Sequence, residues 1–256
     1  MYIYIIMFSL CIPTMNRFES FLKKYLELYL KNELIDEIII SDENGNDVNC
    51  INQYFGENTK IKCYVNKKQL GPFLNKITCC KLAKNEWIVL MDSDNFADEN
   101  YFKIGKEFIF KNISTIKKNS ILAPSFAMPN FNYTHLNGVC LNKNNLNGLK
   151  NEKNNMKRHH CSSDVLMNTG NYILNKYLTD NINLSNDIGL IQNSSACDVI
   201  LFNTMLFEQL NLEMYIVENL HYSHIVHTGS IYTQTCGLTK KYIDIVNQRY
   251  FTLKNV

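Results

Sequence analysis

IVLMDSDNFADE, residues 88–99, is a short apolar run that ends in two aspartates separated by one residue. Side chains of residues i and i+2 point to the same side of an extended strand, so Asp92 and Asp94 can both face one point beyond the strand end. Two carboxylates held this close repel each other unless a neighbouring group compensates their charge. The stretch therefore predicts a buried strand that carries two acidic side chains to a polar site.

The composition is that of one folded domain. The 256 residues are 46% hydrophobic and 12% aromatic, enough for one sizeable core, so we expect a single α/β domain over 1–256. A net charge of +2 gives no support to a nucleic-acid partner held by bulk electrostatics. The abundant Asn and Lys are typical of AT-rich genomes, as in large DNA viruses and some protists, and carry no functional weight.

The cysteines and the N-terminus bear on location. Nine cysteines form no C-x-x-C pair, and Cys79 and Cys80 are adjacent, which predicts reduced thiols in the cytoplasm, or in the host cytoplasm if the protein is viral. The apolar start, residues 1–13, has no basic segment or cleavage site and is too short to span a bilayer. It predicts a buried first strand, with Met7 as an alternative start, and no transmembrane segment.

Strand-like and helix-like runs alternate through the first half of the chain. Strands are predicted at 8–14, 37–42, 61–66 and 86–92, with turn residues at 43–47. A helix is predicted from Asn16, with Glu19 completing a capping box, to about Lys31, and another from 71 to 82. Polar residues follow the strands, so the pattern predicts a site at the edge of an α/β sheet.

The second half is less regular. A strand is predicted at 121–124, a long loop at 128–160 that includes the solvated basic run 153–160, and ordered structure again at 165–175. Ser194 or Ser195 is expected to cap a helix from Asp198 to Leu210, followed by a strand at 213–217. The lone tryptophan, Trp87, lies in a predicted strand and is expected to pack in the core.

Six segments occur in the order that is typical of GT-A-fold glycosyltransferases, and the chain resembles the large inverting family 2 of that class. They are IPTMNR (12–17), EIIISD (37–42), VNKKQLGPFLNK (65–76), NEWIVLMDSDN (85–95), CDVILF (197–202) and HYSHIVH (221–227). The resemblance implies a Rossmann-like mixed sheet with helices on both faces. It also implies a nucleotide-sugar-binding half, 1–120, and an acceptor-binding half, 121–256.

The resemblance implies a role for the paired aspartates. It implies that Asp94 is a direct ligand of Mn²⁺ or Mg²⁺, and that Asp92 contacts ribose or metal-bound water and is a second candidate ligand. Carboxylates suit a hard cation, and such a cation neutralises the charge that grows on a leaving diphosphate. From the residues alone, a turn or helix cap with Asp94 and Asp98 in solvent remains an alternative.

The resemblance also implies donor contacts from several loops: Pro13, Thr14, Asn16, Arg17, Asp42, Asn66, Gly71, Asn75, Asp92, Ser93 and Gly170. Asp42 would accept the N–H of uracil, which favours a UDP-sugar because cytosine lacks that donor. The inserted KKQL lengthens the family spacing before Gly71. From the residues alone, Asp42 equally suits an Asx turn, and Asn16 suits simple helix initiation.

Asp198 is implied to be the catalytic base, which takes the proton of the acceptor hydroxyl as that oxygen attacks the sugar. A helix N-terminus and a nearby cation both favour the ionised carboxylate that a base requires. The sequence has ACD where the family usually has an acidic residue before the aspartate. The alternative is an ordinary first-turn aspartate that interacts favourably with the helix dipole.

Three histidines lie at 221, 224 and 227. No cysteine or carboxylate in the segment completes a closed zinc site, so structural zinc is disfavoured. The resemblance implies that His224 supplies the remaining protein ligand of the metal, with His227 as second choice, and His221 is expected to be a surface residue. Gly229 and Ser230 are suited to donate to a diphosphate.

The sequence therefore predicts a metal-dependent glycosyltransferase that moves a hexose or N-acetylhexosamine from a nucleotide-sugar, preferably a UDP-sugar, to a glycan, protein or lipid hydroxyl with inversion. A non-catalytic nucleotide-sugar-binding or glycan-binding protein is one alternative. A sugar-phosphate nucleotidyltransferase is another, although it requires a Gly-rich loop and IPTMNRFES contains no glycine. A Rossmann oxidoreductase requires G-x-G-x-x-G, which is absent.

Overall fold

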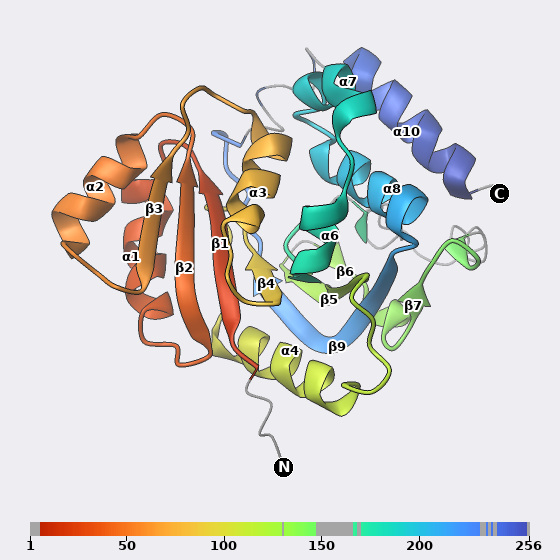
Figure 1. Cartoon of the computed structure of the whole chain (residues 1–256), viewed down its shortest axis with the longest axis horizontal. Coiled ribbons are helices and arrows are strands. Elements are labelled where there is room, and N and C mark those ends of the chain that lie inside the picture. Colours follow the sequence, from red (N-terminus) through yellow and green to blue (C-terminus); the bar gives the residue numbers. More distant parts are fainter. Residues whose placement is uncertain are drawn as a thin grey trace.

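The first half of the chain forms four parallel strands. The computed structural model describes residues 6–129, 131–146, 166–167, 170–230, 234, 237 and 240–254, so the predicted basic loop 153–160 lies outside the described residues. The parallel strands are β1 (Phe8–Thr14), β2 (Ile35–Asp42), β3 (Ile61–Val65) and β4 (Trp87–Leu90). The strands β1, β2 and β3 point the same way in Figure 1. All four predicted strands are confirmed.

The second half extends the same sheet, whose order is β3-β2-β1-β4-β8-β5-β9-β7 with β6 paired to β5. Its strands are β5 (Ser120–Met128), β6 (Phe131–Asn132), β7 (Cys140–Leu141), β8 (Ile173–Asn175) and β9 (Glu213–Ser223), and a short 3₁₀ turn, η2 (Thr134–Leu136), follows β6. β8 lies antiparallel between β4 and β5, while β5 and β9 are parallel. β8 therefore joins the two halves into one mixed sheet.

Helices cover both faces of the sheet, as expected for the GT-A layout. One face carries α3 (Pro72–Lys81), α6 (Lys176–Asn181), η4 (Ser185–Asp187), α7 (Ile188–Asn193), α8 (Asp198–Leu210) and α10 (Lys240–Lys254). The other carries the π-helical turn η1 (Phe18–Leu22), α1 (Lys23–Tyr29), α2 (Asn46–Phe55) and α4 (Glu99–Lys111). Alternation along β1 supplies both cores, because Cys11 faces the first set while Leu10 and Ile12 face the second.

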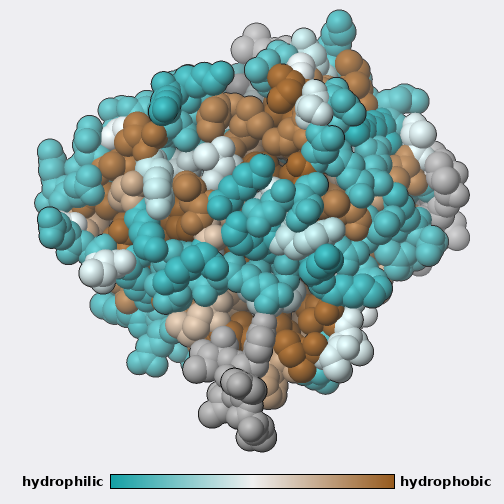
Figure 2. All heavy atoms as spheres, viewed as in Figure 1, coloured by the Kyte–Doolittle hydropathy of each residue, from teal (hydrophilic) through white to brown (hydrophobic). Residues whose placement is uncertain are grey.

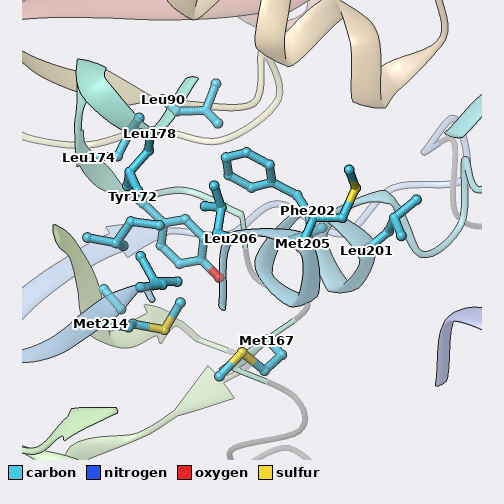
Figure 3. Close-up of a cluster of buried hydrophobic side chains, with 14 of the residues drawn as sticks. Leu90, Met167, Tyr172, Leu174, Leu178, Leu201, Phe202, Met205, Leu206 and Met214 are labelled. Carbon is cyan, nitrogen blue, oxygen red and sulfur yellow. The ribbon is translucent and has the colours of Figure 1, made fainter. Parts of the chain in front are cut away.

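The helix α8 is anchored in the first core. Phe202, Met205 and Leu206 are buried beside Tyr172, which precedes β8 (Figure 3). The amide of Asn203 donates to the Tyr172 hydroxyl at 2.9 Å and to the Met167 carbonyl at 2.9 Å. Hydrogen bonds between buried groups favour one arrangement of the packed elements, although the Asn203 side-chain oxygen itself has no partner among the described residues. The start of α8 is thereby held in a defined place relative to the sheet.

The face drawn in Figure 2 is mostly hydrophilic, with hydrophobic residues gathered in its upper middle part and in a smaller group below the centre. Exposed large side chains such as Tyr54, Phe110 and Val226 come from separate elements. No helix in the described part of the chain combines the length and apolar character of a membrane span. Trp87 is buried in β4, which confirms its predicted packing role.

The predicted helix caps are wrong. Asn16 has a φ of +57°, and the following helical segment begins after Arg17 with no cap from its own side chain. Instead, one oxygen of Asp47 accepts the backbone N–H groups of Arg17 and Phe18, both at 2.8 Å, and the other accepts the Thr14 hydroxyl at 2.5 Å. A carboxylate from the first turn of α2 therefore caps this helix.

The same holds at α8, where Ser194 and Ser195 were expected to cap. The N-cap position is Cys197, which makes no side-chain hydrogen bond to the helix. The predicted span from Asp198 to Leu210 is nevertheless confirmed. The helix is held by its packed face, because tertiary burial outweighs the missing cap.

We expect Asp47→Ala to lower the free energy of unfolding by about 2 kcal/mol, because three donors lose their acceptor. Asn16→Gly is the matched control, since glycine adopts a positive φ without strain, and its effect should stay within about 0.5 kcal/mol. Urea unfolding followed by circular dichroism measures both. An equal loss for the two variants would contradict the assignment of the cap to Asp47.

Candidate active site

Asp92 follows β4 and is held on both sides. Its backbone N–H donates to the Asn171 side-chain oxygen at 2.7 Å, and its carboxylate accepts the Asn171 amide at 3.3 Å. The other carboxylate oxygen lies 3.2 Å from the ammonium nitrogen of Lys76 on α3. Asn171 precedes β8, so three elements converge on this aspartate.

Lys76 also reaches the first residue of α8. Its ammonium nitrogen lies 2.8 Å from an oxygen of Asp198, and the two side chains are only 14% and 11% exposed. Burial raises the pKa of Asp198, and the ammonium of Lys76 opposes that rise. Burial alone would lower the pKa of Lys76, but the charges of Asp198 and Asp92 outweigh it and raise that pKa, so Lys76 stays protonated. One cation therefore links the predicted base to the paired aspartates.

Asp94 points to a different partner. One of its carboxylate oxygens lies 2.9 Å from Nε2 of His227, whose ring packs against Phe21 at 5.1 Å between centroids. The side chains of Asp94 and His227 are each 20% exposed. Within the described ranges, no group of three or more His, Cys, Asp or Glu side chains is arranged to hold a metal ion. The two atoms are hydrogen-bonded to each other, and they could ligate a cation only in place of that bond, with phosphate oxygens and water as the remaining ligands.

His224 packs beside Phe131 and lies close enough to Asp92 and Asp94 for their charges to act on it. Its backbone N–H donates to the Met128 carbonyl at 2.7 Å, and its ring lies edge-on to Phe131 at 4.9 Å. Burial lowers the pKa of His224, opposed by the charges of Asp92 and Asp94. His227 contacts Asp94 directly, whereas His224, the first choice from the sequence, packs against Phe131 with both aspartates nearby, so the order of the two as metal ligands stays a prediction.

His221 has a structural partner. Its Nδ1 lies 2.8 Å from the Asn219 carbonyl in a solvent-exposed contact. This agrees with the expected surface role. Together with the positions of His224 and His227, it gives no support to a zinc site made by the three histidines.

The segment that carries His227 is tied to the loop after β1. A guanidinium nitrogen of Arg17 donates to the Gly229 carbonyl at 2.6 Å. The Ile225 N–H donates to the Asn95 side chain at 3.0 Å, next to Asp94. The residues after β9 therefore lie along both loops that were predicted to bind the donor.

Asp42 is fully buried at the end of β2. Its two oxygens accept the backbone N–H groups of Asn44 at 3.2 Å and Val48 at 3.0 Å, which is the Asx turn that the residues alone allowed. Glu43 is its neighbour and is also buried; one oxygen accepts the Leu70 N–H at 2.6 Å, and the other has no partner among the described residues. Burial raises the pKa of Glu43. Asp42 is therefore occupied by the turn, and the carboxylate of Glu43 is enclosed beside it, near the backbone of Leu70 and Gly71.

Asn66 and Asn75 lie in direct contact. The Asn75 side-chain oxygen accepts the Asn66 amide at 2.9 Å and the Ser41 hydroxyl at 2.6 Å, so the two predicted donor-binding asparagines meet at the end of β2. Gly71 has a φ of +79° at the start of α3, with open space where a Cβ would lie. Its backbone conformation, rather than crowding, requires glycine here.

The remaining predicted residues line the same edge. Pro13 and Thr14 end β1, and the Asn16 side-chain oxygen accepts the amides of Asn44 and Asn46. Ser93 is 8% exposed between the paired aspartates. Gly170 has a φ of +69°, and a Cβ there would lie 2.7 Å from the Val199 side chain. Gly170 therefore lies against the residue that follows Asp198.

Residues 9–113 match the family model described as glycosyl transferase family 2. The match spans the four parallel strands and the paired aspartates but less than half of the chain. No curated protein matches the sequence significantly.

Solved structures establish the fold. S. aureus TarS 1-349 in complex with UDP-GlcNAc has 15% identity and a TM-score of 0.63, with 95% of this chain and 66% of that chain covered. Mannosyltransferase PcManGT from Pyrobaculum calidifontis, in complex with GDP-Man and Mn²⁺, has 10% identity, a TM-score of 0.57 and coverages of 88% and 58%. Glucosyl-3-phosphoglycerate synthase from Mycobacterium tuberculosis, in complex with Mg²⁺ and UDP, has 13% identity, a TM-score of 0.55 and coverages of 95% and 79%. The chain thus has the GT-A glycosyltransferase fold and spans less than two thirds of TarS 1-349 and of PcManGT.

Three site residues were missed by the sequence analysis: Lys76, Asn171 and Glu43. The only signal for Lys76 was a charged residue in an otherwise largely apolar helical run. Asn171 lies beside Gly170, which was predicted, and Glu43 follows Asp42. In each case a neighbouring residue was named from the sequence, because the sequence alone does not show which of two adjacent residues points into the site.

Proposed function

We propose that the chain is a metal-dependent glycosyltransferase that moves a sugar from a nucleotide-sugar donor to a hydroxyl acceptor. The observation that carries this proposal is the placement of two acidic centres at one sheet edge. Asp94 with His227 forms one, and Asp198 with Lys76 and Asp92 forms the other. The donor-binding role of 1–120 and the acceptor-binding role of 121–256 are parts of the same proposal.

Asp198 would act as the base. Its carboxylate takes the proton of the acceptor hydroxyl while that oxygen attacks the anomeric carbon, and the bond to the diphosphate breaks in the same step. A single in-line displacement inverts the configuration at that carbon. The raised pKa of Asp198 predicts that transfer falls on acidification at a higher pH than an ordinary aspartate would give.

Asp94 and His227 would hold Mn²⁺ or Mg²⁺. When bound, such a cation neutralises charge on the leaving diphosphate. The neighbours in complex with Mn²⁺ and Mg²⁺ support this part of the proposal. Asp92 already pairs with Lys76 and accepts the Asn171 amide, so we assign it to positioning these side chains rather than to direct contact with the metal.

A UDP-sugar is the favoured donor. Two neighbours are complexes with UDP-GlcNAc and UDP, whereas a third contains GDP-Man. Glu43 follows Asp42 at the end of β2, and a carboxylate at this strand end would accept the ring N–H of uracil. The acceptor is a glycan, protein or lipid hydroxyl. The seven cysteines of the described residues are free thiols, which supports a reducing compartment such as the cytoplasm.

Calorimetric titration of UDP, GDP and CDP into the purified chain tests the donor class. We expect heat of binding from UDP with Mn²⁺ present, and a large loss of affinity once EDTA replaces Mn²⁺. GDP and CDP serve as controls for base recognition. Equal affinity for all three with and without metal would contradict both the metal and the uridine assignments.

A further inference from the structure

Lys76 is a buried cation with two anionic partners from different parts of the chain. It lies on α3, while Asp92 follows β4 and Asp198 begins α8, 122 residues away from Lys76 in sequence. Its ammonium is 3.2 Å from one carboxylate and 2.8 Å from the other. No other contact in the described site joins the end of β4 to the first residue of α8 through one side chain.

The surroundings of this contact are apolar. Lys76 and Asp198 line a small cavity whose other walls include Phe73, Val199 and Phe202. With little water nearby, an ammonium–carboxylate hydrogen bond is stronger and more directional than at the surface. No side-chain cap is present at the start of α8, so the bond from Lys76, together with the backbone N–H of Val199, sets where the Asp198 carboxylate lies.

We propose that Lys76 is a positioning residue that fixes the Asp198 carboxylate relative to Asp92. The inference rests on the proposed function, because it takes Asp198 as the base. Lys76 does not touch the donor in this assignment and acts only through Asp198. Buried ion pairs contribute little net stability, so we expect this pair to act by fixing the position of the Asp198 carboxylate.

The residue before Asp198 is Cys197, whose thiol gives the base no charged neighbour. The ammonium of Lys76 supplies a fixed hydrogen-bond donor from the opposite helix. A displacement of the base by about 1 Å can cost a factor of about 100 in rate, so such a constraint matters to catalysis.

A double-mutant cycle in donor hydrolysis, with water as acceptor, tests the inference. We expect Lys76→Met to lower the rate of UDP-sugar hydrolysis by about 10- to 100-fold and to leave the affinity for UDP within about threefold. Lys76→Arg should recover part of the rate, because it keeps the charge. In the Asp198→Asn background, Lys76→Met should have no further effect.

Lys81→Met is the matched control, since Lys81 is an exposed lysine of the same helix, and it should retain the wild-type rate. Thermal unfolding reports whether each variant folds, and Lys76→Arg carries the test if Lys76→Met does not. Two results would overturn the inference: Lys76→Met lowers the hydrolysis rate equally in the wild-type and Asp198→Asn backgrounds, or it lowers the affinity for UDP in parallel with the rate. If the wild type hydrolyses the donor in the same experiment, the proposed function still stands. A wild type that neither hydrolyses a UDP-sugar nor binds UDP in Mn²⁺ would overturn both.

Discussion

Asp198→Asn is expected to lower UDP-sugar hydrolysis by about 10²- to 10⁴-fold, because an amide cannot take the proton that the attacking hydroxyl loses. The substitution keeps the size of the side chain and an oxygen that can accept from Lys76, so the fold and the start of α8 should be preserved. UDP affinity in Mn²⁺ should stay unchanged, since Asp198 lies away from the Asp94 and His227 pair. Initial rates and calorimetric titration measure the two quantities separately.

Asp180→Asn is the matched control for this experiment. Asp180 is an acidic residue of α6 that pairs with Lys176 at the surface and lies outside the proposed site. It should retain the wild-type rate. Undiminished hydrolysis by Asp198→Asn would end the candidacy of Asp198 as base, and a parallel loss of UDP affinity would move its role to donor binding.

Asp94→Asn is expected to remove the metal dependence of UDP binding. A neutral amide is a poor ligand for a divalent cation, and the loss of affinity in Mn²⁺ should be at least about tenfold. The residual affinity should equal that of the wild type in EDTA. Calorimetric titrations of UDP with Mn²⁺ and with EDTA give the comparison directly.

Alanine substitution of each histidine tests which of them supports metal-dependent binding of UDP. His227→Ala should reproduce much of the effect of Asp94→Asn, because Nε2 of His227 lies 2.9 Å from Asp94. His221→Ala should have no effect, since His221 contacts only a nearby backbone carbonyl among the contacts described. A loss confined to His224→Ala, with His227→Ala unaffected, would support the ranking predicted from the sequence.

The sequence was most informative where local patterns decide the structure. Apolar runs such as 37–42 and 86–92 became parallel strands, because a strand buried on both faces must be apolar throughout. Parallel strands deliver their carboxyl ends to one edge, so the polar residues after them were correctly expected to gather there. The helix 46–55 was missed because its first residues also suit a turn.

Contacts between distant segments were beyond the reach of the sequence. The cap of the first helix comes from Asp47, about thirty positions along the chain. Lys76 meets Asp198 across 122 positions, and Arg17 meets Gly229 across 212. No periodicity or spacing rule encodes such pairs. Residue types at strand ends could therefore be predicted, but not which oxygen or nitrogen faces which partner.

For the same reason, the sequence alone does not discriminate between neighbouring candidate residues. Asp42 and Glu43 are both acidic and adjacent, and only burial with both oxygens occupied assigns Asp42 to the turn. His224 and His227 differ by three positions, and only the fold of the segment after β9 brings His227 to Asp94.

Release of nucleoside diphosphate from a panel of UDP-, GDP- and CDP-sugars tests the central claim most directly. The purified chain would be assayed without added acceptor, first with Mn²⁺ and then with EDTA. We predict slow release of UDP from at least one UDP-sugar with Mn²⁺, and none with EDTA or with Asp94→Asn. Absence of release across the whole panel, together with no calorimetric binding of UDP in Mn²⁺, would contradict the assignment of this chain as a glycosyltransferase.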